Sequence, residues 1–284
     1  MKKKIVILGS TGSIGKNLLN IISKDKKKFE IILLTAKKNY KILLKQAIFF
    51  KVKNIIITDQ ESYKKATKIN KNKKINIYNN FNIFDKIFTS KIDYTMSSII
   101  GLDGLFPTIK IIKYTKIIAI ANKEAIICGW NLIQKKLNFY KTKFLPVDSE
   151  HFSIWKILGS KKIKDVNQIF LTASGGPFLN KSTNQIKNVK ISEALKHPNW
   201  KMGKKISIDS ATMMNKVFEV IETKNIFSIS YKKIDILVHP KSYIHAIVKF
   251  NDGTYQFLAH EPSMKIPIFN TLYLNHHKEF KSKR

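Results

Sequence analysis

The chain has 284 residues, 44% of them apolar, which is enough for two domains with their own cores. Its single cysteine, Cys128, excludes an intramolecular disulfide, and no apolar run reaches the about 20 residues needed to span a bilayer. The net charge of +33 comes almost wholly from lysine, since Arg284 is the only arginine, so it indicates compositional bias and no specific nucleic-acid partner. We expect a cytoplasmic protein with no membrane partner.

Short apolar runs alternate with helical patterns through the first half of the chain. Runs rich in β-branched residues predict strands at residues 5–8, 30–35, 54–58, 94–97 and 116–121. Periodic apolar residues predict helices at 14–23, 40–50, 102–112 and 123–137, and the polar residues 64–80 predict a surface helix and a loop. Strands that are apolar on both faces and alternate with helices indicate a doubly wound parallel sheet of the Rossmann-like α/β class.

The composition changes near Pro146, after which glycine, proline, histidine and serine cluster in short motifs. Residues 233–238, 244–250 and 254–259 then predict antiparallel strands. We therefore expect two domains: residues 1–147 form the Rossmann-like domain, and residues 148–284 form an α+β domain.

A glycine-rich turn follows the first predicted strand, with the sequence GSTGSIG from Gly9 to Gly15. Glycines allow a tight turn, and the helix start that follows offers free N–H groups to a pyrophosphate. The alternative is a plain strand–helix turn. After the second strand stand Lys37, Lys38 and Asn39, where an NAD site normally has a carboxylate. Two ammonium groups suit a 2′-phosphate, so the pattern favours NADP over NAD.

Acidic residues are informative because the chain has only 19 of them. Asp148 and Glu150 are spaced i, i+2, so on extended chain both carboxylates point the same way and could share one ion. With Glu219 they form an all-oxygen set that suits Mg²⁺ or Mn²⁺ rather than Zn²⁺. The alternatives are a capped helix N-terminus for Asp148 and Glu150 and a solvated helix face for Glu219.

The segment that contains Glu219 predicts a helix with one polar face. Ser210 is expected to be its N-cap, and Asn215, Lys216 and Glu219 are spaced to face one site. The N–H groups of such a helix start, together with Ser210 and Lys216, would hold a phosphate.

Two further loops carry polar or aromatic residues. Residues 172–178 form a serine–glycine segment that suits an anion or a structural turn. His197, Trp200 and Gly203 form a composition that suits a lid over a substrate, or alternatively a surface turn with a half-buried tryptophan. The histidines after residue 230 show no metal-ligand spacing, and Cys128 is expected to be a small buried residue.

Taken together, these motifs resemble the 1-deoxy-D-xylulose 5-phosphate reductoisomerase family. The resemblance rests on GSTGSIG at 9–15, ANKE at 121–124, LPVDSEH at 145–151, SGGPF at 174–178, HPNWKMG at 197–203, DSATMMNK at 209–216 and HP at 239–240. It implies a rearrangement and reduction of a small phosphorylated ketose, 1-deoxy-D-xylulose 5-phosphate, to 2-C-methyl-D-erythritol 4-phosphate in isoprenoid precursor biosynthesis. The implied cofactors are NADPH and Mg²⁺ or Mn²⁺, with Co²⁺ as a further candidate.

The resemblance also implies roles for individual residues. NADPH contacts would be Thr11, Gly12, Ser13, Ile14, Lys37, Lys38, Asn39, Asn122, Glu124 and Gly203. Metal ligands would be Asp148, Glu150 and Glu219, which count as catalytic together with Lys123 and His197. Substrate contacts would be Lys123, Ser149, Glu150, Ser174, His197, Ser210, Asn215, Lys216 and Glu219. Residues 148–284 would form a catalytic and dimerisation domain, so a homodimer is expected.

The sequence departs from the family pattern in two places. Lys37 stands where relatives commonly carry glycine. Relatives also continue beyond the position of Arg284 into a further helical domain, which we expect this chain to lack. The alternative function is therefore a truncated, inactive NADP-binding relic of the enzyme, and a basic nucleic-acid binder is a more distant one.

Overall fold

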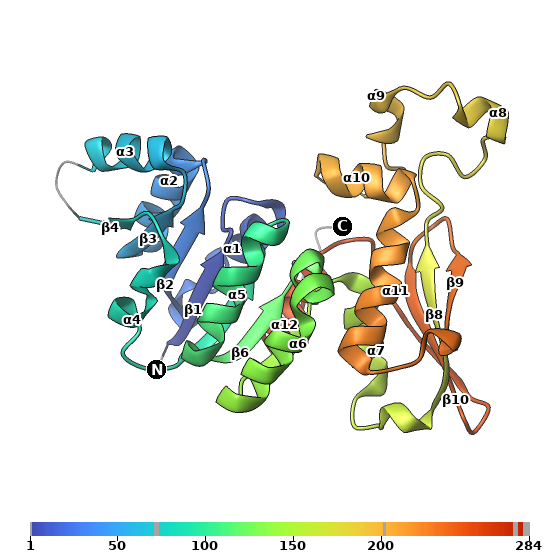
Figure 1. Ribbon diagram of the computed structural model, residues 1–284. Coiled ribbons are helices and arrows are strands. Elements are labelled where there is room, and N and C mark those ends of the chain that lie inside the picture. Colours follow the sequence, from blue (N-terminus) through green and yellow to red (C-terminus); the bar gives the residue numbers. More distant parts are fainter. Residues whose placement is uncertain (1, 71–73, 201–202, 275–277, 281–284) are drawn as a thin grey trace. The chain divides into compact units, whose positions relative to one another are not determined.

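The structure, a computed structural model, describes residues 2–70, 74–200, 203–274 and 278–280. These residues form two compact units (Figure 1). The first unit contains the residues up to Val147 and the described residues from Ile268 onward, and the second runs from Asp148 to Pro267.

The first unit is built on a seven-stranded sheet whose neighbouring strands are all parallel, in the order β4-β3-β2-β1-β5-β6-β7. The strands are β1 (Lys3–Leu8), β2 (Phe29–Ala36), β3 (Asn54–Ile57), β4 (Asn76–Tyr78), β5 (Ile92–Ser97), β6 (Thr115–Ile120) and β7 (Lys143–Pro146). Consecutive residues of β1 from Ile5 to Leu8 have no exposed surface, which means that both faces of the sheet are covered. The predicted doubly wound α/β fold is confirmed.

Helices connect these strands. They are α1 (Ser13–Ser23), α2 (Tyr40–Phe50), α3 (Gln60–Ile69), α4 (Phe84–Ile87), α5 (Leu105–Ile111) and α6 (Lys123–Tyr140). The helix α5 is shorter than the predicted segment because residues 102–104 and 112–114 form 3₁₀ turns. The edge strands β4 and β7 were not predicted, since they have only three and four residues.

The segment from Ile268 onward packs with the first unit, although the sequence division placed it in the second domain. It begins within the helix α12 (Lys265–Leu272). Ile268 is fully buried, and the hydroxyls of Thr271 and Tyr94 lie 3.0 Å apart in the interior. Burial of apolar surface and a partner for the buried Tyr94 hydroxyl explain this placement.

The second unit contains a four-stranded sheet in the order β11-β10-β8-β9. Its strands are β8 (Val166–Ala173), β9 (Ile234–Val238), β10 (Ile244–Phe250) and β11 (Tyr255–Ala259). The strand β10 is antiparallel to both β8 and β11, but β9 is parallel to β8. The expectation that all three late strands are antiparallel was therefore wrong for β9, which follows a helical crossover from β8.

The helices of the second unit are α7 (Ser149–Leu158), α8 (Thr183–Ile186), α9 (Ile191–Ala194), α10 (Lys204–Ala211) and α11 (Met214–Phe227). A core joins α7 and the sheet through Ile154, Val166, Ile169, Leu171 and Val248, and Val220 and Phe227 of α11 pack against it. The helices α7 and α11 also contact each other. This packing brings the two acid-bearing segments together.

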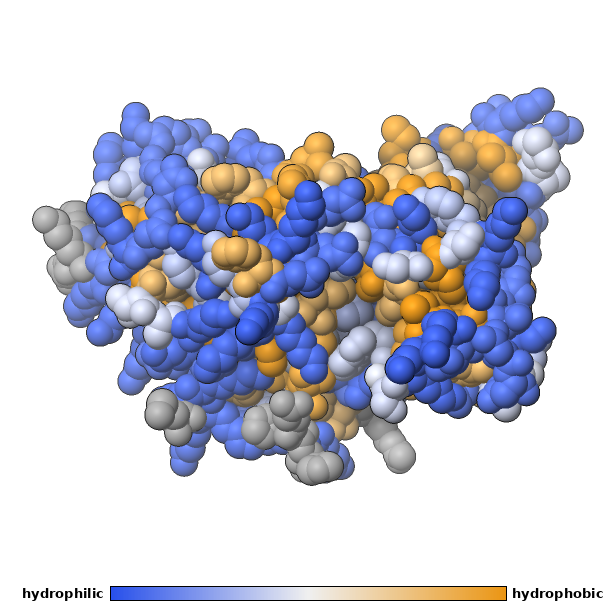
Figure 2. Space-filling view, turned by 60° about the horizontal axis from the view of Figure 1, so that its bottom comes forward, coloured by the Kyte–Doolittle hydropathy of each residue, from blue (hydrophilic) through white to orange (hydrophobic). Residues whose placement is uncertain are grey.

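Hydrophilic residues cover most of the face shown in Figure 2, with separate apolar groups between them. Among the described residues, no helix is both long and apolar enough to cross a membrane. Cys128 is exposed on α6, so the expectation of a buried cysteine was wrong. Its neighbours Gly129 and Trp130 occupy the buried side of that helix.

Candidate active site

Two of the predicted metal ligands lie where α7 begins. Asp148 is the N-cap residue, with φ −54° and ψ 137°, and Glu150 lies in the first helical turn. The expectation that both stand on extended chain was therefore wrong for Glu150, and the alternative of acids at a helix N-terminus describes the local structure. The Asp148 side chain accepts no capping hydrogen bond from the helix, so its carboxylate is directed to other contacts.

The third acid lies on α11, whose start differs from the prediction. Ser210 is in the last turn of α10, and it is not an N-cap. A new helix follows Met213, whose φ of +60° is left-handed and interrupts the helical backbone. The prediction that Asn215, Lys216 and Glu219 share a face is confirmed, because both Asn215 Nδ2 and Lys216 Nζ donate to the Glu219 carboxylate.

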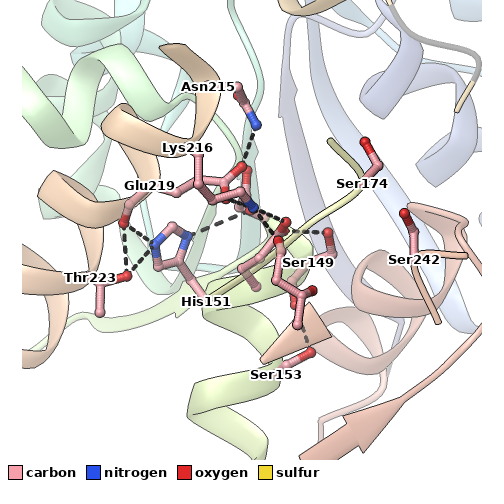
Figure 3. Close-up of polar contacts among 12 residues, drawn as sticks. Ser149, His151, Ser153, Ser174, Asn215, Lys216, Glu219, Thr223 and Ser242 are labelled. Atoms are coloured by element: carbon pink, nitrogen blue, oxygen red, sulfur yellow. Dashed lines mark hydrogen bonds and ion pairs between the residues drawn. The ribbon is translucent and has the colours of Figure 1, made fainter. Parts of the chain in front are cut away.

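The three acids meet in the second unit. One carboxylate oxygen from each of Asp148, Glu150 and Glu219 lies within 4.8 Å of those of the other two. The buried Lys216 donates to Glu150 Oε1 at 2.8 Å, to the Glu219 carboxylate and to the backbone oxygen of Thr172 (Figure 3). The end of β8 and the two helices therefore converge on one ammonium group.

The charges of this cluster suit a divalent cation. Burial alone would lower the pKa of Lys216, but the carboxylates of Glu150 and Glu219 outweigh burial and raise it, so the ammonium stays charged. Three carboxylates and one ammonium leave a formal charge of −2, which one divalent ion would neutralise. Because the acidic donors are all oxygen, they fit Mg²⁺ or Mn²⁺ better than Zn²⁺.

Neighbouring polar groups orient the acids. Ser149 Oγ donates to Glu150 Oε2 at 2.7 Å, and Ser153 Oγ donates to the Ser149 backbone oxygen at 2.7 Å. The predicted substrate contact Ser149 is itself buried. Its hydroxyl therefore holds the Glu150 carboxylate in place.

A second polar group lies at the end of β8. His197 Nδ1 accepts hydrogen bonds from the backbone N–H groups of Asn199 and Trp200, at 3.1 and 3.0 Å. The ring hydrogen is therefore on Nε2, which lies 3.1 Å from Ser174 Oγ. Burial lowers the pKa of His197, which favours this neutral donor form. The structure thus pairs two residues that were predicted to contact substrate.

The serine–glycine segment approaches Ser210. Gly175 and Gly176 have φ of +82° and +70°, a region that favours glycine. A Cβ on Gly176 would lie 2.8 Å from the Ser210 backbone oxygen, so the small residue allows the two segments to touch. Lys201 and Met202 of the proposed lid lie outside the described residues, and Gly203 is the N-cap of α10.

The first unit contains the glycine-rich turn. Gly9 has φ +87°, and a Cβ on Gly15 would lie 2.5 Å from the Gly9 backbone oxygen. Gly12 is the N-cap of α1, so Thr11 precedes the helix start and Ser13 is its first residue. The predicted strand–turn–helix arrangement is therefore present, with the first N–H groups of α1 directly after the turn.

Apart from Gly203, the remaining predicted cofactor contacts lie just after strands of the first unit. Lys37 follows β2 and pairs with Asp103 at 2.7 Å. Asn122 follows β6 and caps α6, because its side chain accepts from the Ala125 N–H at 3.1 Å. Lys123 is only 7% exposed. Lys38, Asn39 and Glu124 lie beside these residues in the chain.

Two buried residues had no role in the sequence analysis. His151 is fully buried, and Glu222 is 1% exposed. Burial alone would lower the pKa of His151, but the carboxylates of Glu222, Asp148 and Glu219 raise it to about 9. The signal in the sequence was their spacing, since His151 follows Glu150 and Glu222 lies one helical turn after Glu219.

Comparison with known proteins gives one consistent result. A family model described as 1-deoxy-D-xylulose 5-phosphate reductoisomerase matches residues 5–129, and one described as the C-terminal domain of that enzyme matches residues 144–227. A relative of this name from Pelagibacter ubique (strain HTCC1062) is 60% identical over 283 residues, which are 99% of this chain and 73% of the relative. Another from Wolbachia pipientis wMel is 44% identical, over 94% of this chain and 68% of the relative.

Solved structures agree. The structure of 1-deoxy-D-xylulose 5-phosphate reductoisomerase from Zymomonas mobilis in complex with NADPH has a TM-score of 0.90 at 34% identity and covers 100% of this chain and 73% of its own. A DOX-P reductoisomerase in complex with NADPH, fosmidomycin and magnesium has a TM-score of 0.91 at 33% identity, over 97% and 71%. The motifs, the fold and these relatives together show that the chain belongs to the 1-deoxy-D-xylulose 5-phosphate reductoisomerase family.

Proposed function

We propose that this chain catalyses the NADPH-dependent conversion of 1-deoxy-D-xylulose 5-phosphate to 2-C-methyl-D-erythritol 4-phosphate with a divalent ion held by Asp148, Glu150 and Glu219. One observation carries the proposal: three carboxylates from two helices converge within 4.8 Å in a chain of this family. In an inactive relic, no function would maintain these three carboxylates around a buried lysine. This favours the enzyme over the inactive alternative.

The residues of the second unit prepare the metal site. The bound ion would polarise the substrate carbonyl and stabilise negative charge on its oxygens, and NADPH would supply the hydride. Ser149 orients Glu150, and Asn215 orients Glu219, each by a direct hydrogen bond. These contacts fix the acids before a ligand arrives, which reduces the reorganisation that binding requires.

We propose that the substrate phosphate binds among Ser174, His197, Ser210, Asn215 and Lys216. His197 offers an Nε2–H donor beside the Ser174 hydroxyl. Lys216 donates to two carboxylates and one backbone oxygen, which uses all three of its N–H groups. A divalent ion on Glu150 and Glu219 would compete for those carboxylates and release the ammonium toward the phosphate. Metal and substrate binding would then reinforce each other.

In the first unit, the turn at residues 9–15 is proposed to hold the pyrophosphate of NADPH, through the sequence that contains Thr11, Gly12, Ser13 and Ile14. Lys37, Lys38 and Asn39 would meet the 2′-phosphate. Asn122, Glu124 and Gly203 are the other proposed cofactor contacts. The buried Lys123 is proposed to donate to a substrate hydroxyl.

We also propose a homodimer formed through the sheet of the second unit. The strand β9 is an edge strand, and its residues Ile236 and Val238 are 42% and 53% exposed. Tyr255 and Phe257 on the opposite edge strand, β11, are 56% and 60% exposed. Exposed apolar edge strands favour pairing with another chain. Sedimentation analysis of the protein and of Val238→Lys tests this, since a wild-type monomer would contradict it.

The activity itself is tested by following NADPH oxidation by absorbance in the presence of 1-deoxy-D-xylulose 5-phosphate and Mg²⁺ or Mn²⁺. We expect turnover that is lost on metal removal and restored when metal is returned. A protein that binds NADPH but does not oxidise it under these conditions would instead be the inactive relic.

A further inference from the structure

A second group of buried polar side chains lies beside the proposed metal ligands. One atom of ligand type from each of Asp148, His151 and Glu222 lies within 4.8 Å of the other two. His151 belongs to α7 and Glu222 to α11, and both are buried. Asp148 therefore belongs to this group and to the proposed metal site.

One side of the His151 ring is fixed by α11. Its Nε2 lies 3.0 Å from the Glu219 backbone oxygen and 3.0 Å from the Thr223 hydroxyl (Figure 3). That hydroxyl already donates its hydrogen to the same carbonyl, at 2.8 Å. Because a carbonyl oxygen only accepts, Nε2 must carry a hydrogen and donate it. The ring thus connects α7 to the backbone of a proposed ligand.

The other ring nitrogen faces two acids. Nδ1 lies 3.6 Å from Asp148 Oδ1 and 3.9 Å from Glu222 Oε2, and among the described residues it has no hydrogen-bond partner. The ring also stacks on Phe227, with centroids 6.5 Å apart and planes at 23°. The Glu222 carboxylate faces the Nδ1 edge, so the contacts at the two ring nitrogens together fix the rotation of the ring.

We propose that Glu222 is a positioning residue that acts through His151 to hold the Asp148 carboxylate beside Glu150 and Glu219. One buried ring then joins the two helices that supply the ligands, with Asp148 and Glu222 both at its Nδ1 edge. The proposal rests on the proposed metal role of these acids, and it adds that metal affinity depends on a carboxylate that does not itself bind the ion.

The competing explanation is that Glu222 is itself a ligand. Asp148, His151 and Glu222 would then hold a second cation, and Asp148 would be shared by two ions. A histidine that donates its other N–H to a backbone carbonyl is common among metal ligands. The number of ions bound per chain separates the two explanations.

The test is direct titration of the metal-free full chain with Mn²⁺. Calorimetry measures the heat of binding, and electron paramagnetic resonance measures the free Mn²⁺. Glu222→Gln keeps the shape and removes the charge. Substitution of a residue that orients a metal ligand typically weakens metal affinity by about 10- to 100-fold. We therefore expect the dissociation constant for Mn²⁺ to rise by about that factor in Glu222→Gln. At saturating Mn²⁺, kcat and the KM for 1-deoxy-D-xylulose 5-phosphate should stay near their wild-type values.

Two further variants complete the experiment. Glu222→Asp keeps the charge and should recover part of the lost affinity. Glu193→Gln makes the same chemical change in the same unit at a partly exposed acid that pairs with Lys181 at 2.6 Å, and it should leave Mn²⁺ binding unchanged.

The expected result is one Mn²⁺ per chain with weaker binding in Glu222→Gln. Unchanged Mn²⁺ affinity in that variant, with only a lower melting temperature, would assign Glu222 a purely structural role and overturn the proposal. Two ions in the wild type and one in the variant would make Glu222 a ligand and overturn it equally. Because binding is measured without turnover, a chain that binds Mn²⁺ as expected but converts no substrate would contradict the proposed activity alone.

Discussion

The two units prepare their sites by different means. In the first, the turn at residues 9–15 is shaped by the backbone, because Gly9 has a left-handed φ and Gly15 has no room for a Cβ. In the second, the site consists of charged side chains that hold one another, with Lys216 between Glu150 and Glu219. The first site should therefore respond to side-chain volume and the second to side-chain charge.

The largest effect is expected from a change of charge at Glu219. Glu219→Gln preserves volume but removes one of three proposed metal ligands. Metal-ion catalysis contributes several kcal/mol, so we expect kcat to fall by more than about a hundredfold even at saturating Mg²⁺ or Mn²⁺. Steady-state NADPH oxidation measures this. Turnover at the wild-type rate would contradict the assigned metal role of Glu219.

Lys216 tests the same site from the cationic side. Lys216→Ala removes the ammonium that separates Glu150 from Glu219. We expect the KM for 1-deoxy-D-xylulose 5-phosphate to rise by about 10- to 100-fold, because a charged hydrogen bond to phosphate contributes about 1.5–3 kcal/mol. Substrate saturation curves measure the change. A lower kcat with an unchanged KM would assign Lys216 to the chemistry and not to phosphate binding.

A change of volume tests the first unit. A Cβ at Gly15 would lie 2.5 Å from backbone atoms of Gly9 and Ser10, whereas one at Gly12 would meet only the Gly9 oxygen, at 3.4 Å. Gly15→Ala should therefore lower the free energy of unfolding by about 1–3 kcal/mol, as overpacking does. Gly12→Ala should leave stability nearly unchanged. Urea denaturation measures the free energy of unfolding of both variants. Equal values would show that the backbone of the turn shifts to accommodate a Cβ at Gly15.

The fold of the first unit could be predicted further than that of the second. Strands such as 5–8 are continuous apolar runs because both sheet faces are covered, and that composition is visible in a sequence. The direction of β9 depends on which strand it pairs with, and the break at Met213 depends on a backbone angle. Neither is encoded in periodicity, so Ser210 was assigned to the wrong helix position.

The candidate site was predicted only in part. Scarce acids and the family motifs indicated Asp148, Glu150 and Glu219, and the structure brings their oxygens together. Glu222 lies one helical turn after Glu219, but that spacing does not show burial, and only packing shows that Glu222 is buried beside His151. The sequence indicates which side chains are available, whereas packing decides which of them are removed from water.

A smaller effect concerns pH and the buried charge of the second unit. Burial, followed by the neighbouring His245, lowers the pKa of His260 to about 4, and the two rings stack with centroids 3.9 Å apart. Between about pH 4 and 6.5, His260 therefore binds more protons in the unfolded chain than in the folded one. The contribution of neutral His260 to stability is complete above that range and is lost as pH falls through it. Because the ring is partly exposed, we expect about 1 kcal/mol.

His260→Phe keeps an aromatic ring beside His245 and removes the titration. The free energy of unfolding of the wild type should fall more steeply from pH 6.5 to 4 than that of the variant. Chemical denaturation at several pH values measures the difference, which separates His260 from the carboxylates that titrate in both proteins. Parallel curves would show that His260 keeps its ordinary pKa.

The smallest effect on stability is expected at Lys37, where the first unit does use a charged side chain. Its ion pair with Asp103 is 2.7 Å long, but both side chains are more than 60% exposed, and solvent screening leaves such pairs little effect on stability. Lys37→Ala should therefore leave the melting temperature nearly unchanged and raise the KM for NADPH without raising that for NADH. The increase should shrink at high salt, because screening weakens exposed charges. An equal change for both cofactors would place Lys37 away from the 2′-phosphate, and Lys38 and Asn39 would then remain as its proposed contacts.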